Sequence, residues 1–453
     1  MNTQRRFRLG LRVRVRVRGP VRAGLPVAVC LAGLAGLAGL PPPARAALWT
    51  LDRSVETRLQ ADDNPDLSPR PGAAAHSVSL SGLLATSLQT PTRSTRLDAD
   101  ATAWWTGQGS AQNRVDARLG LNHTWRLETA EWRWGGQAQQ ETTFSDRVSL
   151  LAPTTAPTTG APTGPGAAGA DLGLGRGQRR SIGLNTGYSH AFNDVLTAQL
   201  QAQTSRTQYG RALPGAVDFR NVDASAALSW RSTERNTWNA QLGQSHFATQ
   251  PQASSTSRSS TFTLGATHAL SETSSASISL GAYRSVSASS QNISVCPLPG
   301  DFCQLGLVAP VLVQLRGTRR DSGLQYSAAY SAQWLETTRL RLQADRQQAP
   351  SGSGVVLRSD RLLTTLEHSF SERAGLDASY LFARSAYTGL AGSPRPQLQV
   401  LQAALARRLG EGLSLRAGLQ WTHSGEATLQ LNARSHQVYV TLRLDGRRLD
   451  ATR

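Results

Sequence analysis

The feature of this sequence that most restricts its fold is an alternation of apolar and polar residues along almost the whole chain. In Val222 to Trp230, every second residue is apolar, and most of those between are small or polar. Because successive side chains of a β-strand point to opposite faces, this period predicts strands with one apolar face. The stretches are about 10 residues long, whereas strands of soluble proteins usually have about 5–6 residues. Tilted strands that cross a bilayer need about 9–11 residues.

Eighteen such stretches can be counted, and sixteen remains possible because a hairpin can be misread. They lie near residues 48–61, 75–89, 95–106, 114–127, 130–142, 180–192, 195–209, 222–231, 237–248, 259–270, 274–285, 322–335, 338–348, 359–370, 374–387, 397–409, 412–422 and 434–444. The connections alternate between short turns and long loops, the longest being 143–179 and 286–321. This plan predicts a closed antiparallel transmembrane β-barrel of 16–18 strands, with long extracellular loops and short periplasmic turns.

A barrel is the form that such strands can take in a membrane. Hydrocarbon offers no partner for backbone N–H and C=O groups, so the sheet has to close on itself. The polar faces then line a lumen wide enough to hold water. We expect the following side chains to face this lumen: Arg118, Arg126, Gln199, Gln201, Gln203, Arg339, Arg341 and Asp345.

The N-terminus has the composition of an export sequence. An arginine-rich segment is followed by an apolar stretch from Leu25 to Leu40 and by Ala44-Arg45-Ala46. This order predicts a Sec-type signal peptide over residues 1–46, with cleavage after Ala46, and a barrel over 47–453. A transmembrane anchor is the alternative, although the apolar stretch is short and rich in small residues.

Loss of this segment changes the meaning of the high positive charge. The whole chain carries a net charge of +18, but nine of its 48 basic residues lie in the segment and no acidic residue does. The remaining chain has 39 basic and 30 acidic residues, a net charge of +9. We therefore expect no nucleic-acid partner.

Two cysteines follow the proposed cleavage site. Cys296 and Cys303 lie in the expected loop 286–321, and in an exported chain this favours a small disulfide-closed loop. A metal site would need further Cys or His residues nearby, and the sequence has none there. The apolar segment Leu305–Val313 leaves two possibilities, a loop folded into the barrel mouth or an external loop.

Aromatic residues gather near the expected short turns. The tryptophans that we expect to form an inner girdle at the headgroup layer are Trp125, Trp132, Trp230, Trp238 and Trp334. A turn motif also recurs: His, any residue, Phe or Leu, Asn or Ser, then an acid, at residues 190–194, 268–272 and 368–372. Because these histidines lie on separate hairpins, we expect no metal site among them.

No catalytic, cofactor-binding or metal-binding motif is present, and we expect the protein not to be an enzyme. The pattern favours a passive pore or an export conduit in the outer membrane of a Gram-negative cell. A structural or assembly component with a plugged lumen is the alternative, and an outer-membrane hydrolase is a more distant one.

The segment Val55 to Pro65, which contains Asp62-Asp63-Asn64, resembles the first hairpin of a proteobacterial family of outer-membrane barrels linked to exosortase (PEP-CTERM) and exopolysaccharide loci. The turn Ser189 to Asp194 is similar to turns of the same group. The resemblance implies a role in surface-polymer or protein export, with outer-membrane lipid, the assembly machinery and polysaccharide or secretion components as partners. The sequence departs from most such barrels because its last strand, up to Leu444, lacks a terminal aromatic residue and is followed by a polar tail.

Overall fold

A computed structural model describes residues 47–65, 67–107, 113–142, 177–210, 216–250, 254–295, 311–350, 356–387, 395–426, 431–446 and 449–452. The chain divides into two units, Met1–Pro43 and Ala44–Arg453, and the described residues all belong to the second. The proposed signal peptide therefore lies outside them. Among the residues described, no helix is long and apolar enough to cross a bilayer.

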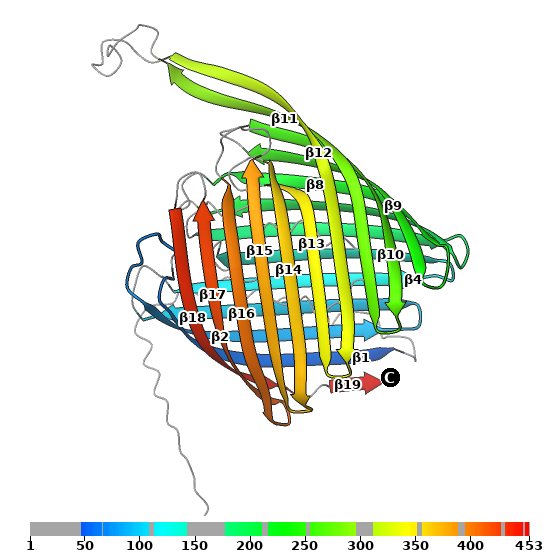
Figure 1. Ribbon diagram of the computed structural model, residues 1–453, viewed down its shortest axis with the longest axis vertical. Helices are drawn as coiled ribbons and strands as arrows, with labels where there is room; N and C mark the ends of the chain where they lie inside the picture. Colours follow the sequence, from blue (N-terminus) through cyan, green and yellow to red (C-terminus); the bar gives the residue numbers. More distant parts are fainter. Residues whose placement is uncertain are drawn as a thin grey trace, which may run out of the picture. The chain divides into compact units, whose positions relative to one another are not determined.

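The described chain is built from β-strands (Figure 1). They are β1 (Leu48–Asp62), β2 (Ala75–Gln89), β3 (Arg93–Thr106), β4 (Arg114–Arg126), β5 (Ala130–Thr142), β6 (Gln178–Ala191), β7 (Leu196–Tyr209), β8 (Asp218–Arg231), β9 (Asn236–Gln250), β10 (Ser254–Ser271), β11 (Ser274–Val295), β12 (Val311–Leu335), β13 (Thr338–Pro350), β14 (Val356–Ser371), β15 (Ala374–Tyr387), β16 (Pro396–Gly410), β17 (Leu413–Glu426), β18 (Leu431–Asp445) and β19 (Leu449–Thr452).

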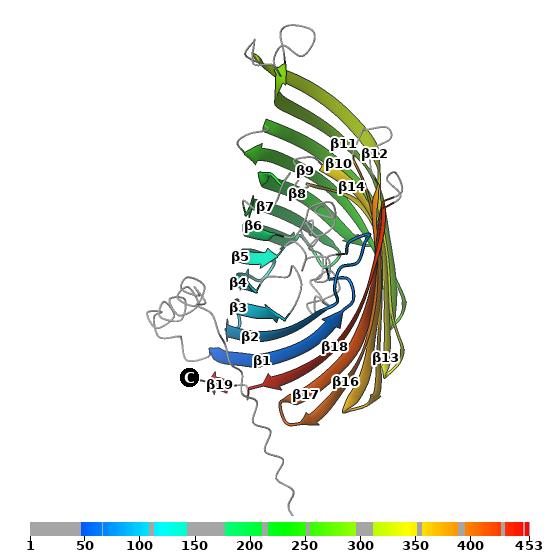
Figure 2. The ribbon, with the colours of Figure 1, turned by 90° about the vertical axis from the view of Figure 1, so that its left-hand side faces the viewer.

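Strands β1 to β18 form a closed antiparallel barrel in which each strand pairs with its neighbours in the sequence. Pairing of β1 with β18 closes the ring, as the curved wall in Figure 2 shows. The barrel prediction is confirmed, with the higher of the two predicted strand numbers. The tail after Leu444 also contributes, because β19 pairs with the beginning of β1.

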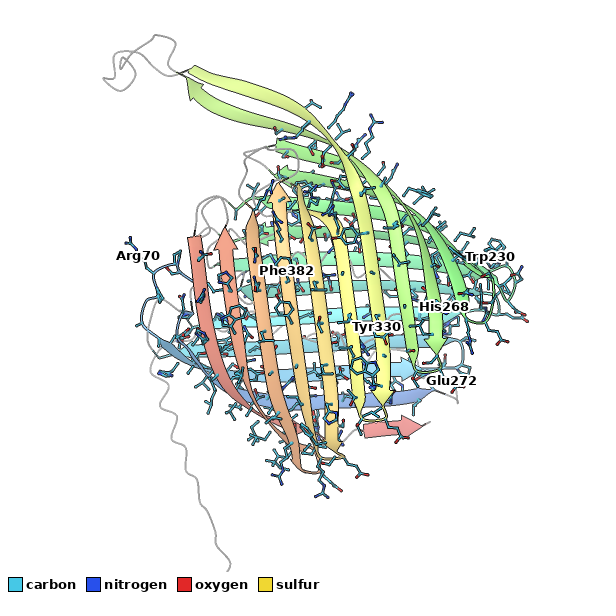
Figure 3. The ribbon with its side chains drawn as sticks, viewed as in Figure 1. Arg70, Trp230, His268, Glu272, Tyr330 and Phe382 are labelled. Atoms are coloured by element: carbon cyan, nitrogen blue, oxygen red, sulfur yellow. The ribbon has the colours of Figure 1, made fainter. Side chains whose placement is uncertain are left out.

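The register of the strands separates an outer from an inner face. On β8, Val222, Leu228 and Trp230 point outward together with their partners on β7 and β9. Many large apolar side chains on this outer face are exposed, and Figure 3 shows the side chains around the wall. They form a belt around the barrel that includes Leu59, Val78, Ile182, Leu200, Leu228, Leu242, Leu264, Leu280, Leu324, Leu342, Leu362, Leu401, Leu419 and Val440.

The recurring turn motif has a structural reason. Its fourth residue accepts hydrogen bonds from backbone N–H groups two and three positions later, as Asn193 does from Val195 and Leu196 and Ser371 does from Arg373 and Ala374. These side-chain bonds hold the chain in a tight turn. The turn between β16 and β17 contains Gly412 instead, whose φ of 71° is a backbone conformation that glycine adopts without strain.

The expected long loop 286–321 is largely a hairpin instead. Strand β11 continues to Val295 and β12 begins at Val311, with paired residues along the whole length. The hairpin projects beyond the neighbouring strands (Figure 1). Cys296 and Cys303 lie outside the described residues, so their disulfide stays a prediction.

The barrel closes with the help of Asp62-Asp63-Asn64, which we call the closure motif. The backbone N–H of His436 donates to Asp63 Oδ1 at 2.7 Å, and the His436 ring bonds to Asp63 Oδ2 at 2.7 Å. Asn64 is 1% exposed, and its Nδ2 donates to the carbonyl oxygens of Arg434 and Ser68 at 2.8 and 2.9 Å. The motif thus extends the contact between the first and last long strands beyond their ladder.

Candidate functional site: the barrel lumen

The inner face of the barrel carries the polar groups with which a solute would interact. The register places all eight predicted lumen residues on this face: Arg118 and Arg126 on β4, Gln199, Gln201 and Gln203 on β7, and Arg339, Arg341 and Asp345 on β13. Arg339 and Arg341 are exposed, whereas Asp345 is buried. The eight residues thus surround the lumen on three separate parts of the wall.

Opposite charges on the inner wall form bridges between strands. Arg361 on β14 donates from Nε and Nη2 to Asp345 Oδ1 at 3.0 and 2.9 Å. Arg416 on β17 reaches over one strand to Asp377 on β15, at 2.9 Å. Gln203 donates to Asp223 at 2.9 Å. The inner wall thus carries both signs of charge.

The two halves of the inner face differ in their access to solvent. Toward the short turns, exposed polar side chains include Asn122, Arg126, Arg133, Gln137, Asn185, Arg339, Arg341, Arg408 and Arg443. Toward the long connections, inward side chains are buried on most of the wall, including Thr207, Asn221, Phe247, Ser285, Ser359, Ser385, Leu398, Thr422 and Gln437. Solvent therefore reaches the inner face mainly on the side of the short turns.

Part of the buried inner wall is apolar. Leu381 and Ala383 on β15 pack with Leu398 and Val400 on β16, and Leu363 joins this cluster. Leu398 and Val400 are fully buried. The sequence contains an indication of this cluster, because apolar residues stand next to each other at Leu362-Leu363, Leu381-Phe382 and Val400-Leu401, where both faces of the strand are apolar.

A second inward cluster is aromatic. The ring of Phe219 on β8 lies 5.3 Å from that of Phe247 on β9 and 6.3 Å from that of Tyr209 on β7, measured between centroids. Both phenylalanines are buried. The inner wall near the long connections thus includes water-poor surface on β7–β9 as well as on β14–β16.

The described residues show no group of three or more His, Cys, Asp or Glu side chains placed to hold a metal ion. The three motif histidines lie on separate strands and point outward: His190 on β6, His268 on β10 and His368 on β14. The rings of His190 and His368 each meet the following phenylalanine of their motif edge-on, at 4.8 Å.

The predicted girdle tryptophans all lie on the outer face near short turns. Trp125 stands directly opposite Trp132, and Trp230 opposite Trp238. Trp334 lies next to the end of β12 and is exposed. An exposed apolar belt around a closed antiparallel barrel is the architecture of proteins that sit in outer-membrane lipid.

No protein-family model and no curated protein matches this chain. Solved structures that resemble it include OccAB3 from Acinetobacter baumannii, at 10% identity and a TM-score of 0.43 over 88% of this chain and 99% of that one. The outer membrane protein opdK from Pseudomonas aeruginosa has 11% identity and a TM-score of 0.42 over 89% and 99%. The closed form of the ferric-catecholate import receptor Fiu from E. coli has 10% identity and a TM-score of 0.42 over 89% and 82%. At such low scores, function has to be argued from the barrel itself.

Proposed function

We propose that this protein is an outer-membrane β-barrel of a Gram-negative cell that carries polar solutes through its lumen. The observation that carries the proposal is a closed wall with an apolar outer belt and a polar inner face that solvent reaches from the short-turn side. Unpaired polar groups are costly inside a dry core, so exposed inward residues such as Arg339 and Arg341 indicate a space that holds water.

We also propose that the conduit is narrower toward the long connections. Inward residues such as Leu398, Val400 and Phe247 are buried there, so we expect passage of a solute to need an opening of this part of the lumen. This arrangement suits a conduit that selects or is gated at its outer end better than a wide, permanently open pore.

The same burial favours a second candidate function, a barrel with a permanently filled lumen that serves as a structural or assembly component. We also propose a role in polysaccharide or protein export and membership of the exosortase-associated type of barrel. The closure motif, on which that resemblance rests, has a structural task that is independent of what the barrel transports.

Conductance in planar bilayers separates the two functions. We expect discrete conductance from the purified, folded barrel, and a shift of the reversal potential toward cation preference in Arg339→Glu/Arg341→Glu, because two exposed inward cations become anions. The control Arg373→Glu/Arg407→Glu makes the same charge change in a turn and on the outer face. A folded barrel without conductance and without solute uptake into liposomes would contradict transport and support the filled-lumen function.

We further propose that residues 1–46 are removed after Ala46, that Cys296 and Cys303 form a disulfide, and that the five tryptophans form the inner girdle. N-terminal sequencing of the membrane-inserted protein tests the first. Peptide mapping without reducing agent tests the second. Depth-dependent quenching of single-tryptophan variants by brominated lipids tests the third, with quenching expected to be greatest for bromines near the headgroups.

A further inference from the structure

Basic side chains form a continuous row on the outer face of β7–β12, immediately beyond the apolar belt on the side of the long connections. Arg206 on β7 stands directly opposite Arg220 on β8, and His246 on β9 stands directly opposite Arg258 on β10. Diagonal neighbours complete the row, which consists of Arg206, Arg220, His246, Arg258, Arg284 and Arg320. All six side chains are exposed. We call these residues the basic row.

Within the described part of the chain, the basic row has no anionic partners of its own. Among the described outward residues of β7–β12, Asp218 is the one carboxylate, and it accepts a hydrogen bond from the backbone N–H of Tyr209 at 2.8 Å. Directly opposite side chains lie about 4.5–5.5 Å apart at Cβ, and like charges in this position are destabilising. An anion between or above the two guanidinium groups would therefore stabilise the pair Arg206–Arg220.

The opposite side of the barrel is different. There, Arg346 on β13 donates from Nη2 to Asp360 on β14 at 3.1 Å, and Arg384 on β15 stands directly opposite Asp360. Near the closing strands, His436 is bonded to Asp63. Basic side chains at this height thus have protein carboxylates nearby on that side, whereas, within the described residues, those of the basic row do not.

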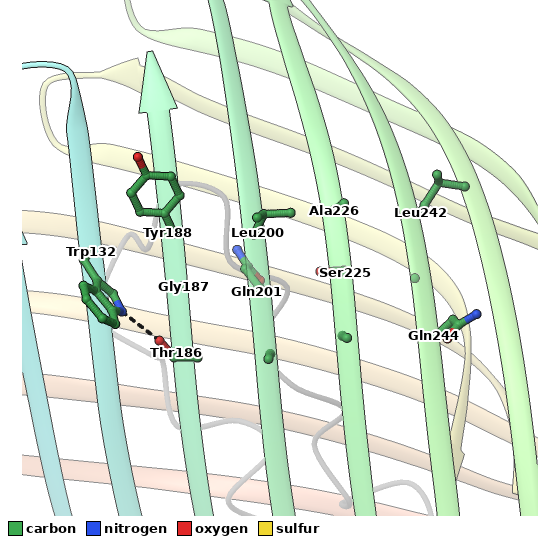
Figure 4. A pocket seen from close by; sticks show the side chains of 13 residues that line it. Trp132, Thr186, Gly187, Tyr188, Leu200, Gln201, Ser225, Ala226, Leu242 and Gln244 are labelled. Carbon is green, nitrogen blue, oxygen red and sulfur yellow. Dashed lines mark hydrogen bonds between the residues drawn. The ribbon is translucent and has the colours of Figure 1, made fainter. Parts of the chain in front are cut away.

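A groove of about 730 Å³ lies on the outer face, on the short-turn side of Arg206 and Arg220. Figure 4 shows Trp132 and Tyr188 on one side of it and Leu242 on the other. Its floor is made by small residues, among them Ala202, Ala224 and Ala226. We call this the outer groove.

The outer groove and the basic row are aligned along the same two strands. Arg206 follows Ala202 by four residues on β7, and Arg220 precedes Ala224 by four on β8. At about 3.3 Å per residue, the backbone positions of the two arginines lie about 13 Å along the strands from those of Ala202 and Ala224. A lipid whose anionic headgroup is held by the arginines would therefore place its hydrocarbon chain in the groove.

We propose that the basic row and the outer groove together form a binding site for a phosphorylated membrane lipid, with its phosphates on the arginines and an acyl chain in the groove. Arginine suits this task because its planar guanidinium group binds phosphate oxygens in a bidentate manner. The apolar belt continues into the groove, so the ligand is a lipid of the surrounding leaflet rather than a soluble phosphate. The proposal rests on the placement of the barrel in an outer membrane, and it is independent of conductance.

The test uses the folded full-length barrel in neutral detergent, with lipid A as the probe and phosphatidylcholine for comparison, and binding followed by native mass spectrometry. We expect lipid A to bind at least tenfold more tightly than phosphatidylcholine. The variant Arg206→Gln/Arg220→Gln should lose at least tenfold in lipid A affinity. The control Arg384→Gln/Arg434→Gln removes the same charge from exposed outward positions of β15 and β18 and should bind like the unchanged protein.

A second variant tests the groove. Ala202→Trp/Ala226→Trp fills its floor on an exposed outward face, and we expect weaker lipid A binding with no loss of folded, heat-modifiable protein. Equal binding by the Arg206/Arg220 variant and its control would overturn the site, as would displacement of lipid A by millimolar inorganic phosphate. Conductance of the same samples separates this inference from the proposed function, because failure of lipid binding in a conducting barrel overturns the lipid site alone.

Discussion

Two junctions of the barrel wall have similar ladders but are held in different ways. At the junction of β1 and β18, residues Ser54–Asp62 pair with Gln437–Asp445, and β19 extends the contact. At the junction of β12 and β13, pairing runs only from Tyr326 to Leu335 on the β12 side. Beyond it, residues 311–325 of β12 have no partner strand on that side within the described chain.

The side chains at the two junctions explain the difference. At the closing junction, the guanidinium carbon of Arg58 lies 3.9 Å from the centre of the buried Tyr439 ring, and the closure motif binds β18 beyond the ladder. Beside the open junction, Arg361 and Arg346 tie β13 to β14 through Asp345 and Asp360.

Strand β13 therefore pairs with β14 along its whole length, whereas its residues beyond Arg346 have no partner on β12. Gln348 accepts a hydrogen bond from Ser259 on β10 at 2.8 Å, so the freed end of β13 reaches the inner side of β10. The first and last long strands are thus held together by side-chain contacts beyond their ladder. A junction between consecutive strands can open partly, because a turn still connects them.

Hydrogen exchange should show the largest difference between the junctions. Alternate amides of an antiparallel strand point to opposite neighbours, so about half of the amides in residues 317–324 lack a strand partner. We expect these to exchange at least about a hundredfold faster than amides of residues 438–444, which have partners on both sides. Mass spectrometry of matching peptides measures this, and equal protection of the two segments would show that the β12–β13 junction is closed in solution.

Asn64→Ala should weaken the closing junction. The substitution removes three hydrogen bonds of a buried side chain, and we expect a loss of about 2 kcal/mol, because the carbonyl oxygen of Arg434 is left without that donor. The midpoint of urea unfolding, followed by the gel mobility of folded and unfolded barrel, measures it. The control Asn122→Ala changes an exposed inward residue and should leave the midpoint unchanged; an equal effect of both would remove the special role of Asn64.

The pair Asp63–His436 should give a small pH dependence. Partial burial would raise the pKa of Asp63, but hydrogen bonds from the backbone and ring of His436 and the ring's charge lower that pKa below its ordinary value. Its contribution is therefore fully present above the unfolded pKa of about 3.9 and is lost as the pH falls through the lower folded value. Both side chains are well exposed, so we expect only a few tenths of a kcal/mol.

Unfolding midpoints at pH 6 and pH 2.5 measure this effect against Asp63→Asn. The variant should lose the part of the pH dependence that comes from this carboxylate. A variant with the same pH dependence as the unchanged protein would show that Asp63 contributes nothing to it.

Most of the wall could be predicted from the sequence, because each bilayer-facing strand must alternate. The expected strand at 130–142 matches β5 (Ala130–Thr142), and the expected faces of Val222–Trp230 are those of β8. The parts of β11 and β12 that extend toward their long connection could not be predicted in this way. Ser287–Ser290 and Arg316–Asp321 contain mainly small or charged residues and show no apolar alternation. Strands beyond the belt do not contact lipid and therefore have no apolar face to reveal them.

The lumen was less predictable for a different reason. Polar residues such as Arg339 indicate the inner face, but which of them meet water depends on what lies across the barrel. The burial of Leu398 and Val400 was indicated only by the adjacent apolar residues. The closure motif stood out as a resemblance, yet its role depends on contacts such as that of Asp62 with Ser435, which is 373 residues away.

The central claim is that the outer face of the barrel meets lipid and the inner face meets the lumen. A spin-label scan of residues 222–230 on β8 in liposomes tests it most directly, with Cys296 and Cys303 replaced by serine. Labels at the even positions point outward in the register. We expect oxygen, which concentrates in lipid, to relax them strongly and a water-soluble nickel chelate to relax them weakly, with the ratio reversed at positions 225, 227 and 229. A constant ratio along the strand, or even positions reached best by the chelate, would contradict a barrel that faces lipid with its apolar side.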